Sequence, residues 1–236
     1  MITIIKLILI GLYTILLSVV ALISIVVDRT FISYHYLSKI FSVGILFISG
    51  VRVKITGLEN IDKNSTYVFV SNHSSQFDIP VLQWSVPNKL AMIFKKELSK
   101  IPIFGWQLKY GPYIMVDRKS PESGMKSIEE SKELMKTKGI SILVFPEGTR
   151  SETGELLPFK RGAFHLAAKV GYPIVPVTII NSDKIMPKGT FKLNRGTIRL
   201  IFDKPILTDH IKGKVDEIKL MDEIKSIMLN NKEKFL

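Results

Sequence analysis

The chain of 236 residues contains no cysteine. This absence excludes disulfide bonds, zinc sites with thiolate ligands and cysteine nucleophiles. A Gly-x-Ser-x-Gly elbow, which would mark a serine nucleophile on an α/β sheet, is also missing. Histidine is scarce and scattered, without the spacing of a metal-ligand motif, and we expect no metal site. The four histidines are His35, His73, His165 and His210.

Acidic residues are outnumbered by basic ones. The chain has 33 Lys and Arg against 21 Asp and Glu, a net charge of +12. Such a surface attracts partners that carry phosphate or other anions, including nucleic acid, anionic lipid and an acidic carrier protein. Nucleic acid is the least favoured of these, because no nucleic-acid-binding motif accompanies the charge.

Long apolar runs are confined to the N-terminal region. Residues 7–27 carry no charged side chain, and about 20 such residues suffice to cross a bilayer core. No small-residue cleavage site follows, so a removed signal peptide is not expected. Residues 31–51 are apolar at helical spacing but contain His35 and Lys39. They predict an interfacial helix with Lys39 at the level of the lipid headgroups, or else a buried core helix.

Residues 1–50 are therefore predicted to form a hydrophobic helical hairpin that anchors the chain in a membrane. Arg52 and Lys54 follow the hairpin directly. Positive charge beside an apolar segment favours the cytoplasmic side. We accordingly expect a membrane-bound protein, in the cell membrane, with the remainder of the chain facing the cytoplasm.

From residue 51 onward, strand and helix patterns alternate. This alternation predicts an α/β fold in which helices flank a largely parallel or mixed sheet, with residues 51–236 as one domain. No internal repeat or low-complexity linker interrupts it. We expect strands at residues 51–56, 66–71, 89–94, 112–116, 140–145, 174–180 and 197–202, and helices ending near Trp84 and at residues 121–138, 160–170 and 215–232.

One polar segment follows the strand at residues 66–71. His73 lies where this strand ends, and Asp78 is expected about one turn into the next helix. If His73 precedes the helix, its ring can fold back so that the carboxylate fixes one ring nitrogen and leaves the other as a base. The alternative is that His73 caps the helix and Asp78 is a solvated first-turn acid.

Further polar groups follow other strands, where active groups of open α/β sheets gather. Gly148 permits close approach, so its N–H is a candidate donor to an oxyanion. Arg150 offers a planar fork for a phosphate. Lys95 and Arg118 lie at two more strand ends and extend the predicted phosphate pocket. Alternatively, this region is a polar turn and the cations are solvated surface charges.

Four ordered blocks of the chain resemble the motifs of a known family. The blocks are His73-x-x-x-x-Asp78, then Lys95-x-x-Leu98 with Gly105 and Arg118, then Phe145-Pro-Glu-Gly-Thr-Arg150, then Val175-Pro-Val177. They resemble the glycerolipid acyltransferases, most closely the 1-acylglycerol-3-phosphate O-acyltransferases (lysophosphatidate acyltransferases), over about residues 50–205. By themselves, residues 175–177 predict only core packing.

The resemblance implies an acyl thioester donor, either acyl-CoA or acyl-carrier protein, and a lysophosphatidate acceptor that becomes phosphatidic acid. It implies no cofactor. His73 is then the general base and Asp78 its partner, with Gly148 completing the catalytic group. The substrate-binding residues it implies are Lys95, Arg118, Glu147, Thr149 and Arg150.

Direct attack of the acceptor hydroxyl fits the residues present, because it needs a base and no covalent acyl-enzyme. An imidazole, with its usual pKa of about 6.5, suits that task near neutral pH. Glycerol-3-phosphate or another lysolipid is an alternative acceptor. A non-catalytic membrane lipid-binding protein is the alternative from a different class, but binding alone does not require the pair of His73 and Asp78.

Overall fold

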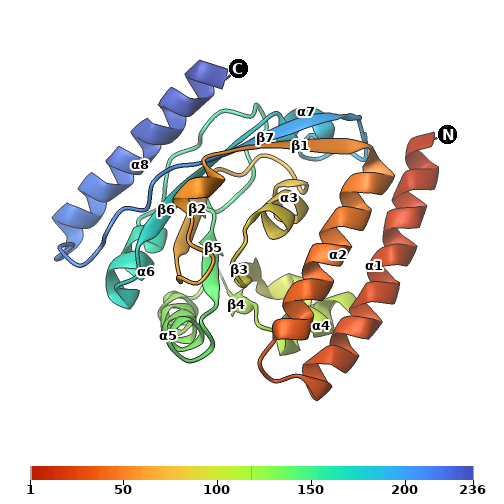
Figure 1. The fold of residues 1–236 in the computed structure, drawn as a ribbon, viewed down its shortest axis with the longest axis horizontal. Coiled ribbons are helices and arrows are strands. Elements are labelled where there is room, and N and C mark those ends of the chain that lie inside the picture. The colour runs from red at the N-terminus through yellow and green to blue at the C-terminus, as the bar shows by residue number, and fades with distance from the viewer. Residues whose placement is uncertain (1, 118, 236) are drawn as a thin grey trace.

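The computed structural model of the chain describes residues 2–117 and 119–235. Within these residues, seven strands form one sheet in the order β1-β7-β6-β2-β5-β3-β4 (Figure 1). Neighbours run parallel, except that β6 and β7 are antiparallel. The expected α/β fold with a mixed sheet is confirmed. The strands are β1 (Val51–Thr56), β2 (Val68–Ser71), β3 (Leu90–Lys95), β4 (Ile114–Val116), β5 (Ser141–Val144), β6 (Ile174–Ile180) and β7 (Gly196–Phe202).

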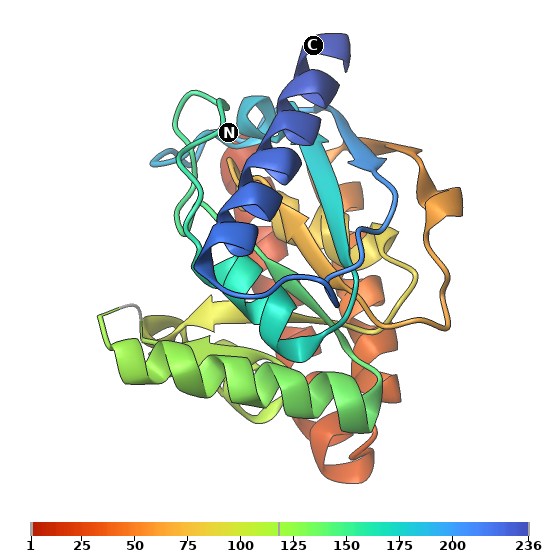
Figure 2. The same ribbon diagram turned by 90° about the vertical axis from the view of Figure 1, so that its left-hand side faces the viewer.

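Helices cover both faces of the sheet, as Figures 1 and 2 show. Alternation along β2 produces the two faces, because successive side chains of a strand point in opposite directions. Phe69 packs into the core on the side of α2 and α3, whereas Val68 and Val70 pack on the side of α5, α6 and α8. The helices are α1 (Ile2–Val27), α2 (Ile32–Ser49), α3 (Asp78–Ser85), α4 (Phe104–Tyr110), α5 (Pro121–Lys138), α6 (Gly162–Val170), α7 (Ser182–Ile185) and α8 (Lys214–Phe235), with short 3-10 turns at Leu58–Asn60 and Lys96–Lys100.

Helices α3, α4 and α7 differ from the expectation. The helix after β2 begins at Asp78 itself, so Asp78 is the first residue of α3 and does not lie a turn inside it. The preceding residues form a loop whose main chain is held by the Asp78 side chain. Helix α4 is not among the helices expected from the sequence, because Pro102 just before it and Gly105 within it are turn-forming residues.

Pro176 lies in β6, a strand interior to the sheet. Proline is normally confined to edge strands, because it has no N–H to donate to a neighbour. The antiparallel ladder with β7 runs from Val177 to Ile180, so Pro176 lies just outside it. Its carbonyl still accepts a hydrogen bond of 3.0 Å from the N–H of Asp203. Val175 and Val177 are fully buried, which confirms the predicted core packing.

The two N-terminal helices form a hairpin that packs onto the rest of the chain. Helix α2 contacts α3, and α1 contacts α2 and α4. Ile45 and Leu46 of α2 belong to the core cluster that contains Phe69. Lys39 donates hydrogen bonds to the carbonyl oxygens of Trp84 and Val86 at the C-terminal end of α3. The ammonium group thus satisfies the end of a helix, and its expected place at the level of the lipid headgroups remains a prediction.

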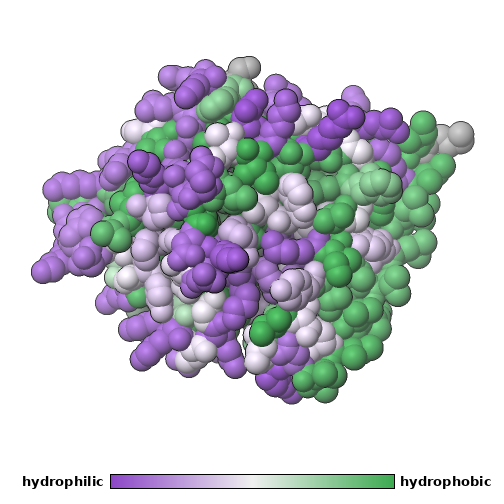
Figure 3. Space-filling view, in the orientation of Figure 1, coloured by the Kyte–Doolittle hydropathy of each residue, from purple (hydrophilic) through white to green (hydrophobic). Residues whose placement is uncertain are grey.

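The opposite side of the hairpin is apolar and exposed. Figure 3 shows this side as a continuous hydrophobic surface over α1 and α2. Both helices are long and apolar enough to cross a membrane. An exposed apolar surface of this extent is typical of membrane or protein contacts, so it favours association of the hairpin with a membrane. On α2 the exposed apolar residues are Ile32, Tyr36, Ile40, Val43 and Phe47.

Candidate active site

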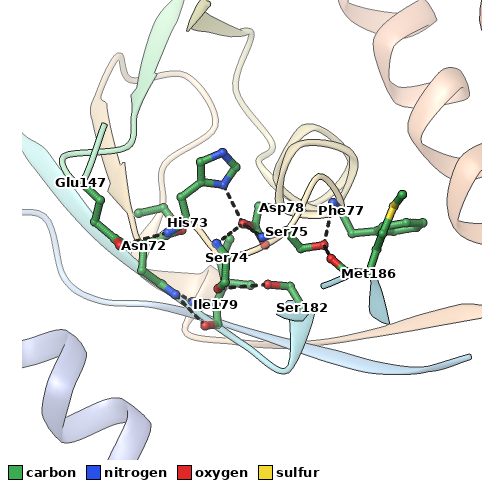
Figure 4. Close-up of polar contacts among 11 residues, drawn as sticks. Asn72, His73, Ser74, Ser75, Phe77, Asp78, Glu147, Ile179, Ser182 and Met186 are labelled. Carbon is green, nitrogen blue, oxygen red and sulfur yellow. Dashed lines mark hydrogen bonds and ion pairs between the residues drawn. The ribbon is translucent and has the colours of Figure 1, made fainter. Parts of the chain in front are cut away.

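His73 and Asp78 lie side by side just beyond the carboxyl end of β2. His73 belongs to the loop that leaves β2, and its Nδ1 is 2.7 Å from Oδ2 of Asp78 at the start of α3 (Figure 4). The ring therefore folds back over the helix start. The predicted pairing of these two side chains is confirmed.

The carboxylate of Asp78 is fully buried. Its Oδ2 also accepts hydrogen bonds from the main-chain N–H groups of Ser74 (2.8 Å) and Ser75 (2.9 Å). Donors that converge on one oxygen compensate for removing a charged group from water. The alternative of a solvated acid at the first turn is therefore wrong for Asp78.

The His73 ring is held on a second side by Phe145. The two rings stack with centroids 4.1 Å apart and an interplanar angle of 16°. The His73 side chain is 16 % exposed, and its Nε2 makes no hydrogen bond to any residue in the described part of the chain. With Nδ1 engaged by Asp78, Nε2 is the nitrogen available to a substrate. Phe145 begins the third block of the family resemblance, but nothing in the sequence assigned its side chain a role in the site.

The main chain around His73 is clamped by partners distant in sequence. The side-chain amide of Asn72 exchanges two hydrogen bonds with the main chain of Ile179 in β6, at 2.9 and 2.7 Å. The carbonyl of His73 accepts from Ser151 N–H at 2.8 Å, and the N–H of His73 donates to Glu147 Oε1 at 2.8 Å. These contacts hold the loop rigidly, as a positioned base requires.

Glu147 is a buried carboxyl group that accepts a hydrogen bond from the main chain of His73. Only 2 % of the residue is exposed, and its Oε2 accepts from the N–H of Leu157 at 3.1 Å. Both oxygens thus face main-chain donors, and this geometry favours a supporting role over the substrate contact expected from the sequence. Burial raises the pKa of Glu147 to about 7, although its hydrogen bonds oppose that rise.

Gly148 has a φ of +67°, in the left-handed region that favours glycine. A Cβ at this position would lie 3.0 Å from Nζ of Lys160, so a cation that sequence reasoning missed sits against the turn. The N–H of Gly148 donates to the carbonyl of Phe145 at 3.1 Å. A role for this N–H as an oxyanion donor remains a prediction and requires that hydrogen bond to open.

The other predicted substrate-binding residues follow adjacent strands. Because β5, β3 and β4 are parallel neighbours, their carboxyl ends meet at one edge of the sheet. Lys95 ends β3 and is exposed, with an ion pair of 3.0 Å to Glu97. After β5, Thr149 is exposed and Arg150 is partly exposed. Arg118 lies outside the described residues. Substrate binding by these four remains a prediction.

The two serines between His73 and Asp78 are engaged elsewhere. Both are buried. The hydroxyl of Ser75 donates to the carbonyl of Met186 at 2.9 Å, and the hydroxyl of Ser74 lies 3.5 Å from that of Ser182 (Figure 4). Neither hydroxyl is hydrogen-bonded to His73, so the geometry does not favour a serine nucleophile.

Comparison with protein families identifies the family of this chain. The model of the family described as acyltransferase matches residues 52–180, more than half of the chain. This chain belongs to the acyltransferase family. The matched span of this acyltransferase includes His73, Asp78 and the loop after β5, and it ends with β6.

Relatives with curated names share part of their length with this acyltransferase. A chloroplastic 1-acyl-sn-glycerol-3-phosphate acyltransferase of Brassica napus is 38% identical over 193 residues, which is 78% of this chain and 55% of the relative. The 1-acyl-sn-glycerol-3-phosphate acyltransferase of Saccharomyces cerevisiae is 35% identical over 187 residues, 75% of this chain and 61% of the relative. The chain thus spans between half and two thirds of these relatives.

A solved structure resembles the whole fold. The crystal structure of the 1-acyl-sn-glycerophosphate (LPA) acyltransferase PlsC from Thermotoga maritima superposes with a TM-score of 0.74 and 26% sequence identity. The superposition covers 100% of this chain and 99% of the other. The resemblance therefore includes the N-terminal hairpin as well as the α/β sheet.

The buried carboxyl of Glu147 predicts a pH-dependent stability. Its pKa rises from an ordinary 4.5 in the unfolded chain to about 7 in the fold. The unfolded chain then loses this proton first, so the fold loses stability as pH rises from 4.5 to 7, on the order of 3 kcal/mol in total. Glu147→Gln cannot titrate and lacks this loss.

The measurement is thermal unfolding of the detergent-solubilised protein between pH 4.5 and 8. The melting temperature of the wild type, relative to Glu147→Gln, should fall across that range. Glu129→Gln, at an exposed position of α5, is the matched control and should follow the wild type. A difference between wild type and Glu147→Gln that stays constant with pH contradicts the account.

Proposed function

We propose that this chain transfers an acyl group from an acyl thioester to the free hydroxyl of 1-acylglycerol-3-phosphate, giving phosphatidic acid. The observation that carries the proposal is the hydrogen bond of 2.7 Å between Nδ1 of His73 and the buried carboxylate of Asp78. The names of the relatives support the choice of acceptor. An acyl thioester of either CoA or acyl-carrier protein is the donor.

The pair provides a general base for direct attack. Asp78 accepts the hydrogen of Nδ1, which keeps Nε2 unprotonated. Nε2 takes the proton of the acceptor hydroxyl while the oxygen attacks the thioester carbonyl. A C–O bond forms, the C–S bond breaks, and the imidazolium returns the proton to the departing thiolate. Asp78 stabilises the transient imidazolium, the role that the aspartate has in Ser-His-Asp triads.

The acceptor phosphate needs cations within reach of His73. Lys95, Arg118, Thr149 and Arg150 follow three adjacent parallel strands, and we assign them to that phosphate. Arg150 supplies a planar fork, whereas Lys95 supplies a point charge. Lys160, whose ammonium group lies against Gly148, adds a further cation beside the same loop.

The acyl chains need an apolar environment next to this polar edge. An apolar cavity of about 90 Å³ lies between the hairpin and α3, lined by Phe41, Ile79 and Met92 among others. Ile79 lies on α3, the helix that begins at Asp78, so the cavity reaches the element that positions the reacting pair. The exposed face of the hairpin holds the site at the membrane where a lysolipid resides.

The competing proposals differ in acceptor or in class. Glycerol-3-phosphate or another lysolipid as acceptor is distinguished by a panel of acceptors, and acyl-CoA and acyl-carrier protein are distinguished by offering each separately. A non-catalytic lipid-binding protein needs only basic charge and an anchor. Burial of Asp78 beneath His73 is costly and serves no purpose in binding alone, which favours the enzyme.

Substitution of His73 tests the proposed chemistry. Loss of a positioned base typically lowers a rate by about 10² to 10⁴, so His73→Ala should abolish phosphatidic acid formation while the protein still folds. Asp78→Asn should be severely impaired, because the tautomer and the imidazolium lose their support. His210→Ala, an exposed histidine, is the control. Turnover of His73→Ala close to that of the wild type would overturn the mechanism.

A second experiment tests the anchor. Electrostatic attraction to anionic lipid is screened by salt, whereas insertion of apolar helices is not. The full chain should therefore stay on vesicles in high salt and leave them only in detergent. Truncation at residue 51 is unsuitable, because Ile45 and Leu46 belong to the core.

Substitution of exposed apolar residues of α2 tests the anchor without removing residues of the core, as truncation would. Val43→Glu with Phe47→Glu should weaken retention on vesicles, whereas Lys54→Glu, at an exposed polar position after the hairpin, changes charge without touching the apolar face. If the unaltered protein washes off vesicles in high salt, the hairpin is not embedded.

A further inference from the structure

The last helix of the chain reaches the loop that supports the active site. Helix α8 packs against β6 and α6, and Figure 2 shows its final turns beside the loop that follows β5. Nζ of Lys232 donates a hydrogen bond of 2.6 Å to the carbonyl oxygen of Gly154 in that loop. The adjacent Asn231 donates to Thr178 (3.0 Å) and Asp203 (2.8 Å), which fixes the end of α8 to the sheet.

Gly154 lies between Lys232 of α8 and Asp183 of α7. Its φ of +80° favours glycine, and a Cβ there would lie 2.9 Å from the carboxyl carbon of Asp183. The same loop continues to Leu157, whose N–H donates to Glu147. Lys232 therefore holds one point of a loop that closes around Glu147, and Glu147 in turn accepts the N–H of His73.

Several carboxylates act electrostatically on the ammonium group of Lys232. Burial lowers its pKa, and the carboxylates of Asp183, Glu147, Asp78 and Glu155 oppose that change. Asp78 and Glu147 are almost entirely buried, and Oδ1 of Asp78 has no hydrogen-bond partner among the described residues. The same loop also carries the cations Arg150 and Lys160, of which Lys160 lies beside Gly148. Lys232 is thus a partly buried cation that compensates for the acids beneath His73.

We propose that Lys232 is a positioning residue for acyl transfer, which keeps the loop closed and Glu147 ionised so that the main chain of His73 stays in place. The proposal rests on the proposed function for its readout. It does not place Lys232 on the substrate, and Lys232 acts on His73 through the acidic groups that hold it, chiefly Glu147.

The pH dependence of the rate separates this role from general stabilisation. Burial raises the pKa of Glu147 to about 7, and Lys232 works against that rise. Without the cation, the pKa of Glu147 rises further, so Glu147 takes up a proton at a higher pH. A protonated carboxyl is a weaker acceptor, so its hydrogen bond from the N–H of His73 weakens. The acidic limb of the rate profile should therefore move to higher pH.

The experiment measures kcat for phosphatidic acid formation between pH 6 and 8.5 on the full chain. In Lys232→Met, which loses both the charge and the hydrogen bond to Gly154, the acidic limb should move up by about half to one pH unit, with a loss about three- to tenfold larger at pH 6.5 than at pH 8.5. Lys232→Gln, which can keep the hydrogen bond to Gly154 but not the charge, should shift in the same way. If Lys232→Met does not fold, the profile of Lys232→Gln alone tests the proposal.

Two controls complete the design. Lys232→Arg retains the charge and should restore the wild-type profile, and Lys234→Met, an exposed lysine of the same helix, should match the wild type. An unshifted limb in Lys232→Gln, or a loss equal at all pH values, overturns the role of Lys232. Activity in His73→Ala, measured in the same assay, overturns the proposed function instead, so the two failures are distinguishable.

Discussion

The hydrogen bond between His73 and Asp78 is the interaction on which the rest of the site depends. Asp78 is buried without a cationic side chain in direct contact among the described residues, and three donors converge on one of its oxygens. That arrangement restricts the loop to a conformation in which the ring folds back over α3. A histidine so held presents one nitrogen in a fixed direction, which is the requirement for a base.

The sheet topology supplies the partners of this pair from distant parts of the chain. Strand β2 lies between β5 and β6. The loop after β5 therefore contributes Phe145 and Glu147, whereas β6 contributes the main chain of Ile179. Candidate phosphate-binding cations follow β5 and β3 at the same edge. The hairpin covers the face on which α3 begins, so apolar surface and reacting pair occupy one side of the molecule.

Sequence patterns predicted those features that local chemistry determines. Helix α5 has the predicted bounds because Ser120 caps its start and Gly139 adopts the left-handed conformation at its end. The pairing of His73 with Asp78 spans five positions and was also predictable. Glu147 contacts His73 across 74 positions, and Lys232 contacts Gly154 across 78. No local pattern encodes such contacts. The supporting role of Glu147, the stacking of Phe145 and the contact made by α8 could therefore be seen only in the three-dimensional structure.

The tautomer of His73 is the most direct test of this account. The chain has four histidines, so ¹⁵N NMR of histidine-labelled protein, with His73 assigned by its absence in His73→Ala, resolves both ring nitrogens. At a pH where the ring is neutral, the account predicts a proton on Nδ1 and none on Nε2, and loss of this preference in Asp78→Asn. A proton on Nε2, or an even mixture of tautomers in the wild type, would contradict it.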